Sequence, residues 1–157
     1  MRAVVQRCRA AQVTVGGTLV ASIGPGLTAF VAVGAGDGEP DLHYIADKLR
    51  GLRVFVAPEA AATGTASPRM TVAVGEVGGE ILLVPQFTLF GDVRRGLRPD
   101  FTAAAMPAVA QGLLGRLASA LRGRGSAVSE GVFGADMRVL VDNDGPVTVL
   151  LDSRRVF

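Results

Sequence analysis

The amino-acid sequence predicts a single layered α/β domain, in which a mixed β-sheet with hairpins carries two main helices on one side. Short apolar segments bounded by Gly and Pro outnumber segments with helical spacing, and two strand–helix–strand passages are mixed with the hairpins. The 157 residues contain no repeat or linker and suffice for one domain of ordinary size. We therefore expect one domain over residues 1–157, with a surface loop at 58–68 and a tail at 153–157.

Strands account for most of the first 33 residues. Residues 3–5 and 13–15 are predicted as two strands, and residues 18–23 and 27–33 as the next pair around Gly24-Pro25-Gly26. The last of these segments is apolar almost throughout, which is typical of a strand buried on both faces. Because Gly-Pro-Gly interrupts this apolar stretch, we do not expect it to span a membrane.

Two segments have the spacing of amphipathic helices. The first has Pro40 near its first turn and leads into a strand at 54–56. Its apolar residues are Leu42, Ile45, Ala46, Leu49 and Leu52. The second helix follows Pro107 and stops near Gly123. Its apolar face comprises Val109, Ala110, Leu113, Leu114, Leu117 and Leu121.

Three further strands complete the predicted sheet. Residues 80–88 are predicted as a buried strand that must bulge or end at Pro85, because proline has no N–H to donate to the ladder. Residues 137–141 and 147–151 are predicted as strands joined by the turn Asn143-Asp144-Gly145-Pro146.

The composition permits a nucleic-acid partner without requiring one. The chain has fifteen Arg, one Lys and a formal net charge of only +2. Arginine suits phosphate binding, but a bias toward Arg, Ala, Gly and Val is also typical of a GC-rich genome, and we favour that explanation.

The scarcity of Cys and His restricts the chemistry more strongly. A lone Cys8 and a lone His43 exclude an internal disulfide and a His/Cys zinc cluster, so we expect no metal site. Cys8, between Arg7 and Arg9, is either a thiol of lowered pKa or a packing residue, and packing is favoured. His43 falls on the polar side of the first helix. A Ser-His-Asp or Cys-His mechanism is therefore not expected. The N-terminus has no signal-peptide core, which indicates the cytoplasm.

Three polar segments remain as candidate sites. Gln86 and Thr88 alternate with apolar residues, which fits either a site or a half-buried strand with a solvated face. The segment 143–148 fits either an ordinary turn or, with a cis Gly-Pro bond, a rigid wall of carbonyl acceptors. Arg94, Arg95 and Arg98 form either a phosphate-binding loop or a solvated one.

Six short motifs follow one another along nearly the whole chain. They are Met1-Arg2-Ala3-Val4-Val5-Gln6-Arg7, Ile23-Gly24-Pro25-Gly26-Leu27, Gln86-Phe87-Thr88-Leu89, Arg98-Pro99, Phe133-Gly134-Ala135-Asp136-Met137 and Asn143-Asp144-Gly145-Pro146-Val147-Thr148. Their order resembles that of the D-aminoacyl-tRNA deacylase (D-tyrosyl-tRNA deacylase) family. The resemblance implies a homodimeric hydrolase that cleaves the ester between a D-amino acid, or glycine, and the 3′ end of tRNA. It implies no metal or organic cofactor, and we expect neither a membrane nor DNA as a partner.

The resemblance also implies roles for particular residues. Gly145 and Pro146, joined by a cis bond, would reach into the active site of the second subunit and exclude L side chains, and Arg7 would hold them in place. Gln86, Phe87 and Thr88 would line the ester pocket and supply main-chain donors to the oxyanion. The 2′-OH of the terminal ribose would help to activate water, which removes the need for a His or Cys. Thr88 is expected to be a pocket hydroxyl rather than a nucleophile.

Pro85 departs from the family pattern, which usually has Ser at this position. A related branch that acts on L-alanine wrongly attached to tRNA resembles this chain in having Pro before Gln. D-specificity is favoured because Phe87 and the 143–148 segment match the D-specific form. The alternatives are a deacylase of altered chirality and a non-catalytic protein that binds the tRNA end.

Overall fold

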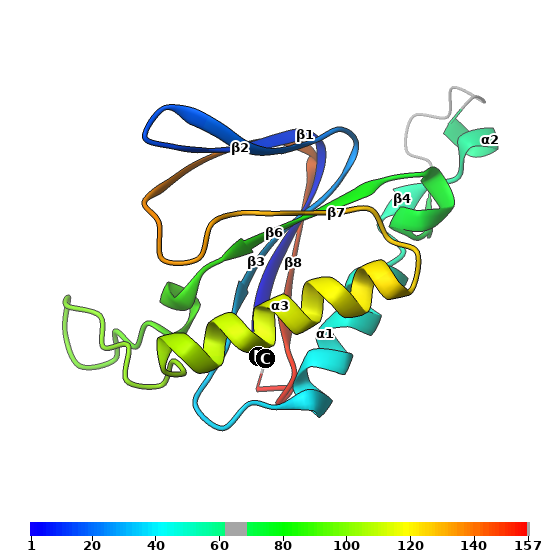
Figure 1. Ribbon diagram of the computed structural model, residues 1–157. Helices are drawn as coiled ribbons and strands as arrows, with labels where there is room; N and C mark the ends of the chain where they lie inside the picture. Colours follow the sequence, from blue (N-terminus) through cyan, green and yellow to red (C-terminus); the bar gives the residue numbers. More distant parts are fainter. Residues whose placement is uncertain (62–68, 157) are drawn as a thin grey trace.

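The computed structural model describes residues 1–61 and 69–156, which form a curled mixed β-sheet with helices α1 and α3 packed side by side on one face (Figure 1). This confirms the predicted α/β class and the placement of the two main helices. The elements are β1 (Arg2–Val15), β2 (Thr18–Ile23), β3 (Gly26–Ala32), α1 (Glu39–Gly51), β4 (Phe55–Val56), α2 (Pro58–Ala61), β5 (Met70–Val72), η1 (Val74–Val77), β6 (Glu80–Pro85), η2 (Phe87–Phe90), α3 (Pro107–Gly123), β7 (Val128–Glu130) and β8 (Met137–Asp152).

The main sheet is held together by β1. Its strands run in the order β2-β1-β3-β6-β7, and β8 pairs with β1. The pairings of β1 with β2, β3 and β8 are antiparallel, whereas β3–β6 and β6–β7 are parallel. The parallel pairs are those whose connections contain α1 and α3, because a crossover needs a long connection. The sheet is therefore mixed, as the sequence predicts.

Apolar side chains form a core on each face of the sheet. Leu27 and Ile81 lie on the helix side with α1 and α3, and both are fully buried. Full burial of such a side chain contributes about 1.5–3 kcal/mol. The opposite face carries a second core that includes Val13 and Leu82, where the sheet curls and brings β2 against β6. Both faces of β6 are thus covered, which explains its continuous apolar run.

The prediction of two short strands at 3–5 and 13–15 is wrong, because β1 is one continuous strand. One edge of β1 pairs with β8 over its whole length, and the other pairs first with β3 and then with β2. The segment between the two predicted strands contains Arg7 and Arg9, which interrupt the apolar pattern. The main chain there nevertheless keeps ladder partners, and pairing overrides the local pattern.

The predicted chain-reversing turn at 143–146 is also wrong, because these residues lie inside β8. Gln6 pairs with Thr148 and Cys8 pairs with Asn143, so Asp144–Val147 lie opposite the single residue Arg7. The segment is a four-residue bulge that leaves the ladder and returns to it. Gly can adopt a positive φ and Pro needs no partner for an N–H, so the two residues suit a bulge as well as a turn.

The strand predicted at 80–88 ends at Pro85 and continues as the 3-10 helix η2. Gln86 and Thr88 therefore do not alternate along a strand. The N–H of Gln86 donates to the carbonyl of Val31 at 2.9 Å and makes the last link to β3. This turn of 3-10 helix brings Phe87 and Thr88 to the edge of the sheet.

The remaining segments agree in part with the predictions. Both helices and the strand near 54–56 are confirmed, and β4 forms a separate two-stranded sheet with β5. The predicted loop at 58–68 begins with the short helix α2, and residues 62–68 lie outside the described residues. In the predicted tail, Arg154 pairs with Asp37 at 2.8 Å, and position 157 lies outside the described residues. None of the helices in the described ranges has both the length and the apolar character needed to cross a bilayer.

Candidate active site

A pocket of about 860 Å³ opens where β3 and β6 end beneath the start of α3. Its wall is largely apolar and comes from the ends of β3 and β6, from η2, from residues 101–110, and from the segment leading into β8. The polar side chains in the wall are Gln86, Thr102 and Asp136. A volume of this size and an apolar wall suit an organic ligand about as large as a nucleoside with one further group attached.

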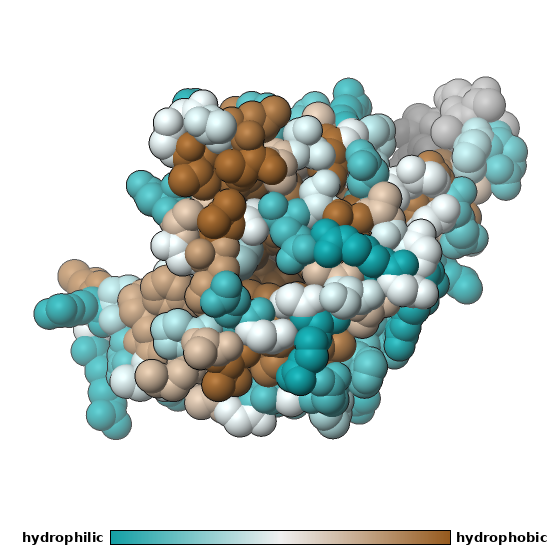
Figure 2. All heavy atoms as spheres, in the orientation of Figure 1, coloured by the Kyte–Doolittle hydropathy of each residue, from teal (hydrophilic) through white to brown (hydrophobic). Residues whose placement is uncertain are grey.

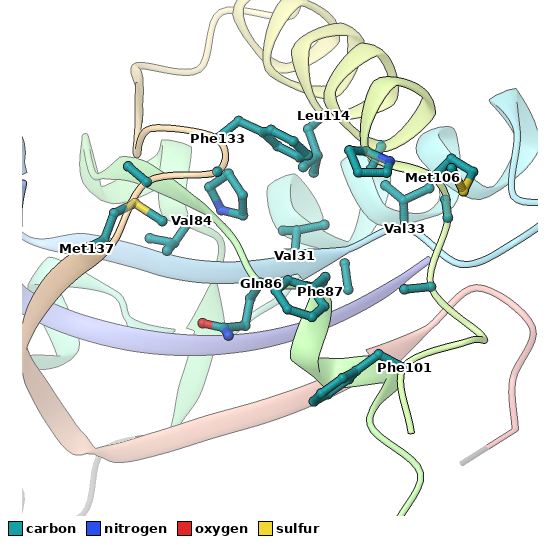
Figure 3. A pocket seen from close by; sticks show the side chains of 18 of the residues that line it. Val31, Val33, Val84, Gln86, Phe87, Phe101, Met106, Leu114, Phe133 and Met137 are labelled. Carbon is teal, nitrogen blue, oxygen red and sulfur yellow. The ribbon is translucent and has the colours of Figure 1, made fainter. Parts of the chain in front are cut away.

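Aromatic rings frame this pocket. Phe87 and Phe101 meet edge to face, with 5.2 Å between their ring centroids and 72° between their planes. Figure 3 shows Phe133 beside Leu114, and Phe87 between Val31 and Phe101. Phe87 is 58% exposed although it is a large apolar side chain, so its ring is accessible to a ligand.

The predicted residues Pro85, Gln86 and Phe87 all line the pocket, but Thr88 does not. Thr88 is exposed beside it, and its hydroxyl accepts a hydrogen bond from the Gln86 side-chain amide. The N–H groups of Phe87 and Thr88 open η2, so no preceding carbonyl within that helix accepts from them. Among the described residues, neither N–H donates to a main-chain carbonyl outside the helices and strands, so both are candidate donors to a ligand beside the pocket.

A second cluster surrounds the Asp144–Val147 bulge. The Nε atom of Arg7 lies 3.0 Å from Asp144 Oδ2 and donates to the Asp144 carbonyl at 3.3 Å. Its Nη1 donates to the carbonyl of Val54 at 2.6 Å. Arg9 pairs with the other Asp144 oxygen at 3.0 Å. Two arginines of β1 thus hold one carboxylate of the bulge.

The bulge is also tied down at its end. The N–H of Val147 donates to Asn143 Oδ1 at 3.1 Å, and the Asn143 amide donates to Thr148 Oγ1 at 3.1 Å. Between these anchors the Gly145–Pro146 bond is cis and both residues are exposed. Gly145 has a φ of +117°, and a Cβ there would lie 2.8 Å from Arg7 Nη2. Glycine is thus required at this position by both its backbone angle and its close neighbour.

Within one chain, the pocket and the bulge are separate. Arg7 pairs with Leu27 on β3, whereas Pro85 pairs with Val31, four residues further along that strand. With the usual rise along a strand and spacing between strands, Arg7 and Pro85 lie about 16 Å apart. The wall of the pocket contains neither Arg7 nor Gly145 nor Pro146. The structure therefore gathers the predicted site residues into two groups and does not join them.

The other candidate groups are structural in the described chain. Cys8 is 2% exposed, and burial raises the pKa of its thiol, so the packing interpretation is confirmed. His43 is exposed on α1, and its Nε2 atom lies 3.8 Å from Glu39. Across the described ranges, no three His, Cys, Asp or Glu side chains lie close enough to hold a metal ion.

Sequence reasoning assigned no role to several wall residues, chiefly Phe101, Met106 and Phe133. The available signal was the motif Phe133-Gly134-Ala135-Asp136-Met137, all of whose residues line the pocket. Phe101 and Met106 come from the irregular segment before α3, which has no period that would have predicted their position.

Comparison with known proteins shows which family has this sequence and fold. The family model described as "D-Tyr-tRNA(Tyr) deacylase" matches residues 4–152. The "D-aminoacyl-tRNA deacylase" of Sorangium cellulosum is 50% identical, and that of Anaeromyxobacter dehalogenans is 48% identical. Each of these matches covers 100% of both chains.

Two solved structures have a similar fold. One, titled "c-Myc DNA Unwinding Element Binding Protein", has a TM-score of 0.86 and 36% identity over 97% of this chain and 98% of its own. The other is titled a "probable eukaryotic D-amino acid tRNA deacylase" and has a TM-score of 0.76. It is 20% identical over 96% of this chain and 97% of its own.

Fold and relatives together define a hydrolase of the D-aminoacyl-tRNA deacylase class. The chain belongs to the D-Tyr-tRNA(Tyr) deacylase family, and its enzymatic character follows from that membership.

Proposed function

We propose that this protein hydrolyses the ester that links a D-amino acid, or glycine, to the 3′ end of tRNA. The match to deacylases along the whole chain, at up to 50% identity, carries the proposal. The pocket supports it, because about 860 Å³ of mostly apolar space has room for a terminal adenosine together with an aminoacyl group. Action on tRNA also places the protein in the cytoplasm.

The wall of the pocket contains no thiol, imidazole or amine. We therefore propose that the nucleophile is a water molecule rather than the hydroxyl of Thr102 or the carboxylate of Asp136. In the proposed reaction, the 2′-OH of the terminal ribose helps this water to attack the ester carbonyl. The carbonyl oxygen then becomes negative, and in this proposal the N–H groups of Phe87 and Thr88 donate to it. When the tetrahedral intermediate collapses, the bond to the ribose 3′-oxygen breaks. That oxygen takes a proton, and the free amino acid and tRNA leave.

Gly145 and Pro146 act in this proposal as the chiral filter, reaching from one subunit of a homodimer into the pocket of the other. Both residues are exposed in a single chain and lie away from its own pocket. Arg7 and Asp144 hold the bulge against β1, so the Gly and Pro carbonyls keep a fixed direction. A rigid wall of acceptors fits an α-amino group and leaves no room for an L side chain.

The specificity is tested with four substrates, D-Tyr-tRNA, L-Tyr-tRNA, Gly-tRNA and L-Ala-tRNA. We expect the D-Tyr and Gly esters to be hydrolysed and L-Tyr-tRNA to be spared. Hydrolysis of L-Tyr-tRNA at the rate of D-Tyr-tRNA would overturn the chiral filter. Pro85 lines the pocket and favours one second candidate function, a deacylase of altered chirality. Preferential hydrolysis of L-Ala-tRNA would establish that function. Binding of tRNA without turnover of any ester would instead establish the non-catalytic alternative.

The shared site is tested with mixed dimers. Ala104→Trp fills the pocket, and Gly145→Val disrupts the bulge. Each variant alone is expected to be inactive. A mixed dimer has one site in which the intact pocket and the intact bulge meet, so random mixing should restore about a quarter of wild-type activity. No recovery in mixtures shown to contain mixed dimers would mean that each chain uses its own bulge.

A further inference from the structure

The segment 92–100 forms a closed loop that projects from the body of the protein. Asp92 and Asp100 pair through two main-chain hydrogen bonds of 2.8 and 2.9 Å, which fasten the base of the loop. Figure 1 shows this yellow-green loop leaving the domain near the start of α3, and Figure 2 shows hydrophilic atoms at its outer edge. The loop contains Arg94, Arg95 and Arg98, and the enzymatic site as described above uses none of them.

Both ends of the loop are attached to the pocket. Before it, the N–H of Gly91 donates to the Thr88 carbonyl at 2.9 Å, which ties the loop to η2. After it, Phe101 packs its ring against Phe87, and Phe101 and Thr102 both line the pocket. The loop therefore lies beside the part of the pocket wall formed by Phe87 and Phe101, within reach of a long molecule whose end occupies the pocket.

The acidic groups of the loop are already occupied. Asp92 accepts from the main-chain N–H of Arg94 at 2.9 Å and forms an ion pair with its guanidinium. These contacts with Arg94 hold the pKa of Asp92 at about 2, so it remains a carboxylate. Asp100 accepts from the N–H of Thr102 at 2.8 Å. The Arg94–Asp92 pair thus shapes the loop, and within the described ranges neither carboxylate forms an ion pair with Arg95 or Arg98.

Arg95 and Arg98 are the available cations. Both are exposed, and within the described ranges no hydrogen bond or ion pair engages either side chain. Leu97 lies between them and is fully exposed. Two free guanidinium groups on a fastened loop can each grip a phosphate through two N–H donors.

We propose that Arg95 and Arg98 bind backbone phosphates of the tRNA whose 3′ end lies in the pocket. This inference rests on the proposed function. Phosphate contacts position a nucleic acid without reading its sequence, so the loop contributes affinity for tRNA in general rather than for one amino acid. Neutralising two phosphates also makes binding weaken with salt, by a slope of about 0.7–0.9 for each contact.

The test compares Arg95→Ala/Arg98→Ala with Arg50→Ala/Arg116→Ala, which removes the same charge from exposed positions on α1 and α3. Two readouts are needed: affinity for uncharged tRNA from about 50 to 200 mM salt, and kcat/KM on D-Tyr-tRNA and on D-tyrosyl-adenosine, which has no phosphate. We expect the loop variant to bind tRNA about tenfold more weakly at low salt, with a salt slope smaller by about 1.4–1.8. The ratio of kcat/KM on tRNA to that on the adenosine ester should fall by a similar factor.

Four results bear on the inference in different ways. Equal tRNA affinity and salt slope in the loop and control variants would overturn it. An equal loss of kcat/KM on both esters would also overturn it, because the loop would then shape the pocket rather than bind phosphate. Arg95→Lys/Arg98→Lys should keep most of the salt slope, since lysine retains the charge. If the wild type hydrolyses neither ester, the proposed function fails, and binding of uncharged tRNA still decides the role of the loop.

Discussion

Arg7 and Asp144 join the two longest strands of the sheet at the point where their ladder is interrupted. The guanidinium Nε atom of Arg7 lies 3.0 Å from Asp144 Oδ2, and the Arg7 side chain is only 13% exposed. Arg7 is also the one β1 residue that faces the four-residue bulge of β8. The arginine therefore lies beside the bulge, in contact with Asp144, and a Cβ on Gly145 would lie 2.8 Å from its Nη2 atom.

Replacing Gly145 should be costly because of both its backbone angle and its neighbour. Gly145→Ala is expected to lower the free energy of unfolding by about 2–4 kcal/mol, which combines a positive-φ penalty with displacement of Arg7. Gly96→Ala is the matched control, since its φ of +123° is close to that of Gly145 and a Cβ there meets nothing within 4 Å. The control should lose only about 1 kcal/mol in urea denaturation. Equal losses would show that the contact with Arg7 contributes nothing.

Asp144 should act on selectivity more than on stability. Asp144→Ala frees Arg7 and Arg9, and because the pair is partly solvated its stability cost should be about 1 kcal/mol or less. We expect the ratio of D-Tyr-tRNA to L-Tyr-tRNA hydrolysis to fall by at least tenfold. Arg9→Ala is the control, because its side chain is 74% exposed and Arg7 remains to hold the carboxylate. An unchanged ratio in Asp144→Ala would contradict the positioning role.

Thr88 should be dispensable for bond cleavage. Its hydroxyl lies outside the pocket wall and accepts a hydrogen bond from Gln86, with no imidazole nearby to remove its proton. Thr88→Ala is expected to keep kcat on D-Tyr-tRNA within about tenfold of wild type. A fall of about 1,000-fold or more, measured in single-turnover assays, would restore Thr88 as the nucleophile.

The ribose hydroxyl should matter more than any side chain of the pocket. tRNA ending in 2′-deoxyadenosine is expected to bind normally but to be deacylated at least 100-fold more slowly, because general acid–base assistance contributes about this much. Binding is measured with uncharged tRNA and turnover with the D-Tyr ester. Equal turnover of the 2′-OH and 2′-deoxy substrates would assign proton transfer to the protein.

The buried thiol should make stability fall in alkali. Because burial raises the pKa of Cys8, the folded protein favours the protonated thiol. Its contribution to stability is complete below the ordinary thiol pKa and is lost as pH rises through the raised value. Cys8→Ala should therefore show a flatter dependence of unfolding free energy on pH between about pH 8 and 10. Parallel curves for the two proteins would contradict this assignment.

The elements that the sequence predicts correctly are those whose local pattern and final packing agree. The face of α1 that carries Leu42 and Leu49 is buried, and β3 is covered on both sides as its apolar run indicates. The prediction of a turn at 143–146 was wrong because Asn-Asp-Gly-Pro suits a strand bulge as well as a reverse turn. Only the pairing of β8 with β1, which joins residues far apart in the chain, distinguishes the two.

The candidate site also has a part that the sequence predicts and a part that it does not. Pro85, Gln86 and Phe87 could be identified because an unusual proline precedes a recognisable motif. The rest of the pocket wall could not, because the wall is assembled from four separate segments whose positions depend on the crossovers through α1 and α3. The separation of the bulge from the pocket likewise depends on strand register and has no local signature.

The apolar wall of the pocket has a consequence for inhibition. Reagents that inactivate hydrolases by modifying a thiol, an imidazole or an amine find no such atom among the residues of the wall. A small molecule that blocks this pocket without modifying Thr102 or Asp136 must do so by reversible occupancy, through complementary shape and stacking against Phe87 and Phe101. If the reactive hydroxyl belongs to the substrate, as proposed above, insensitivity to reagents specific for thiols, imidazoles or amines follows from that arrangement.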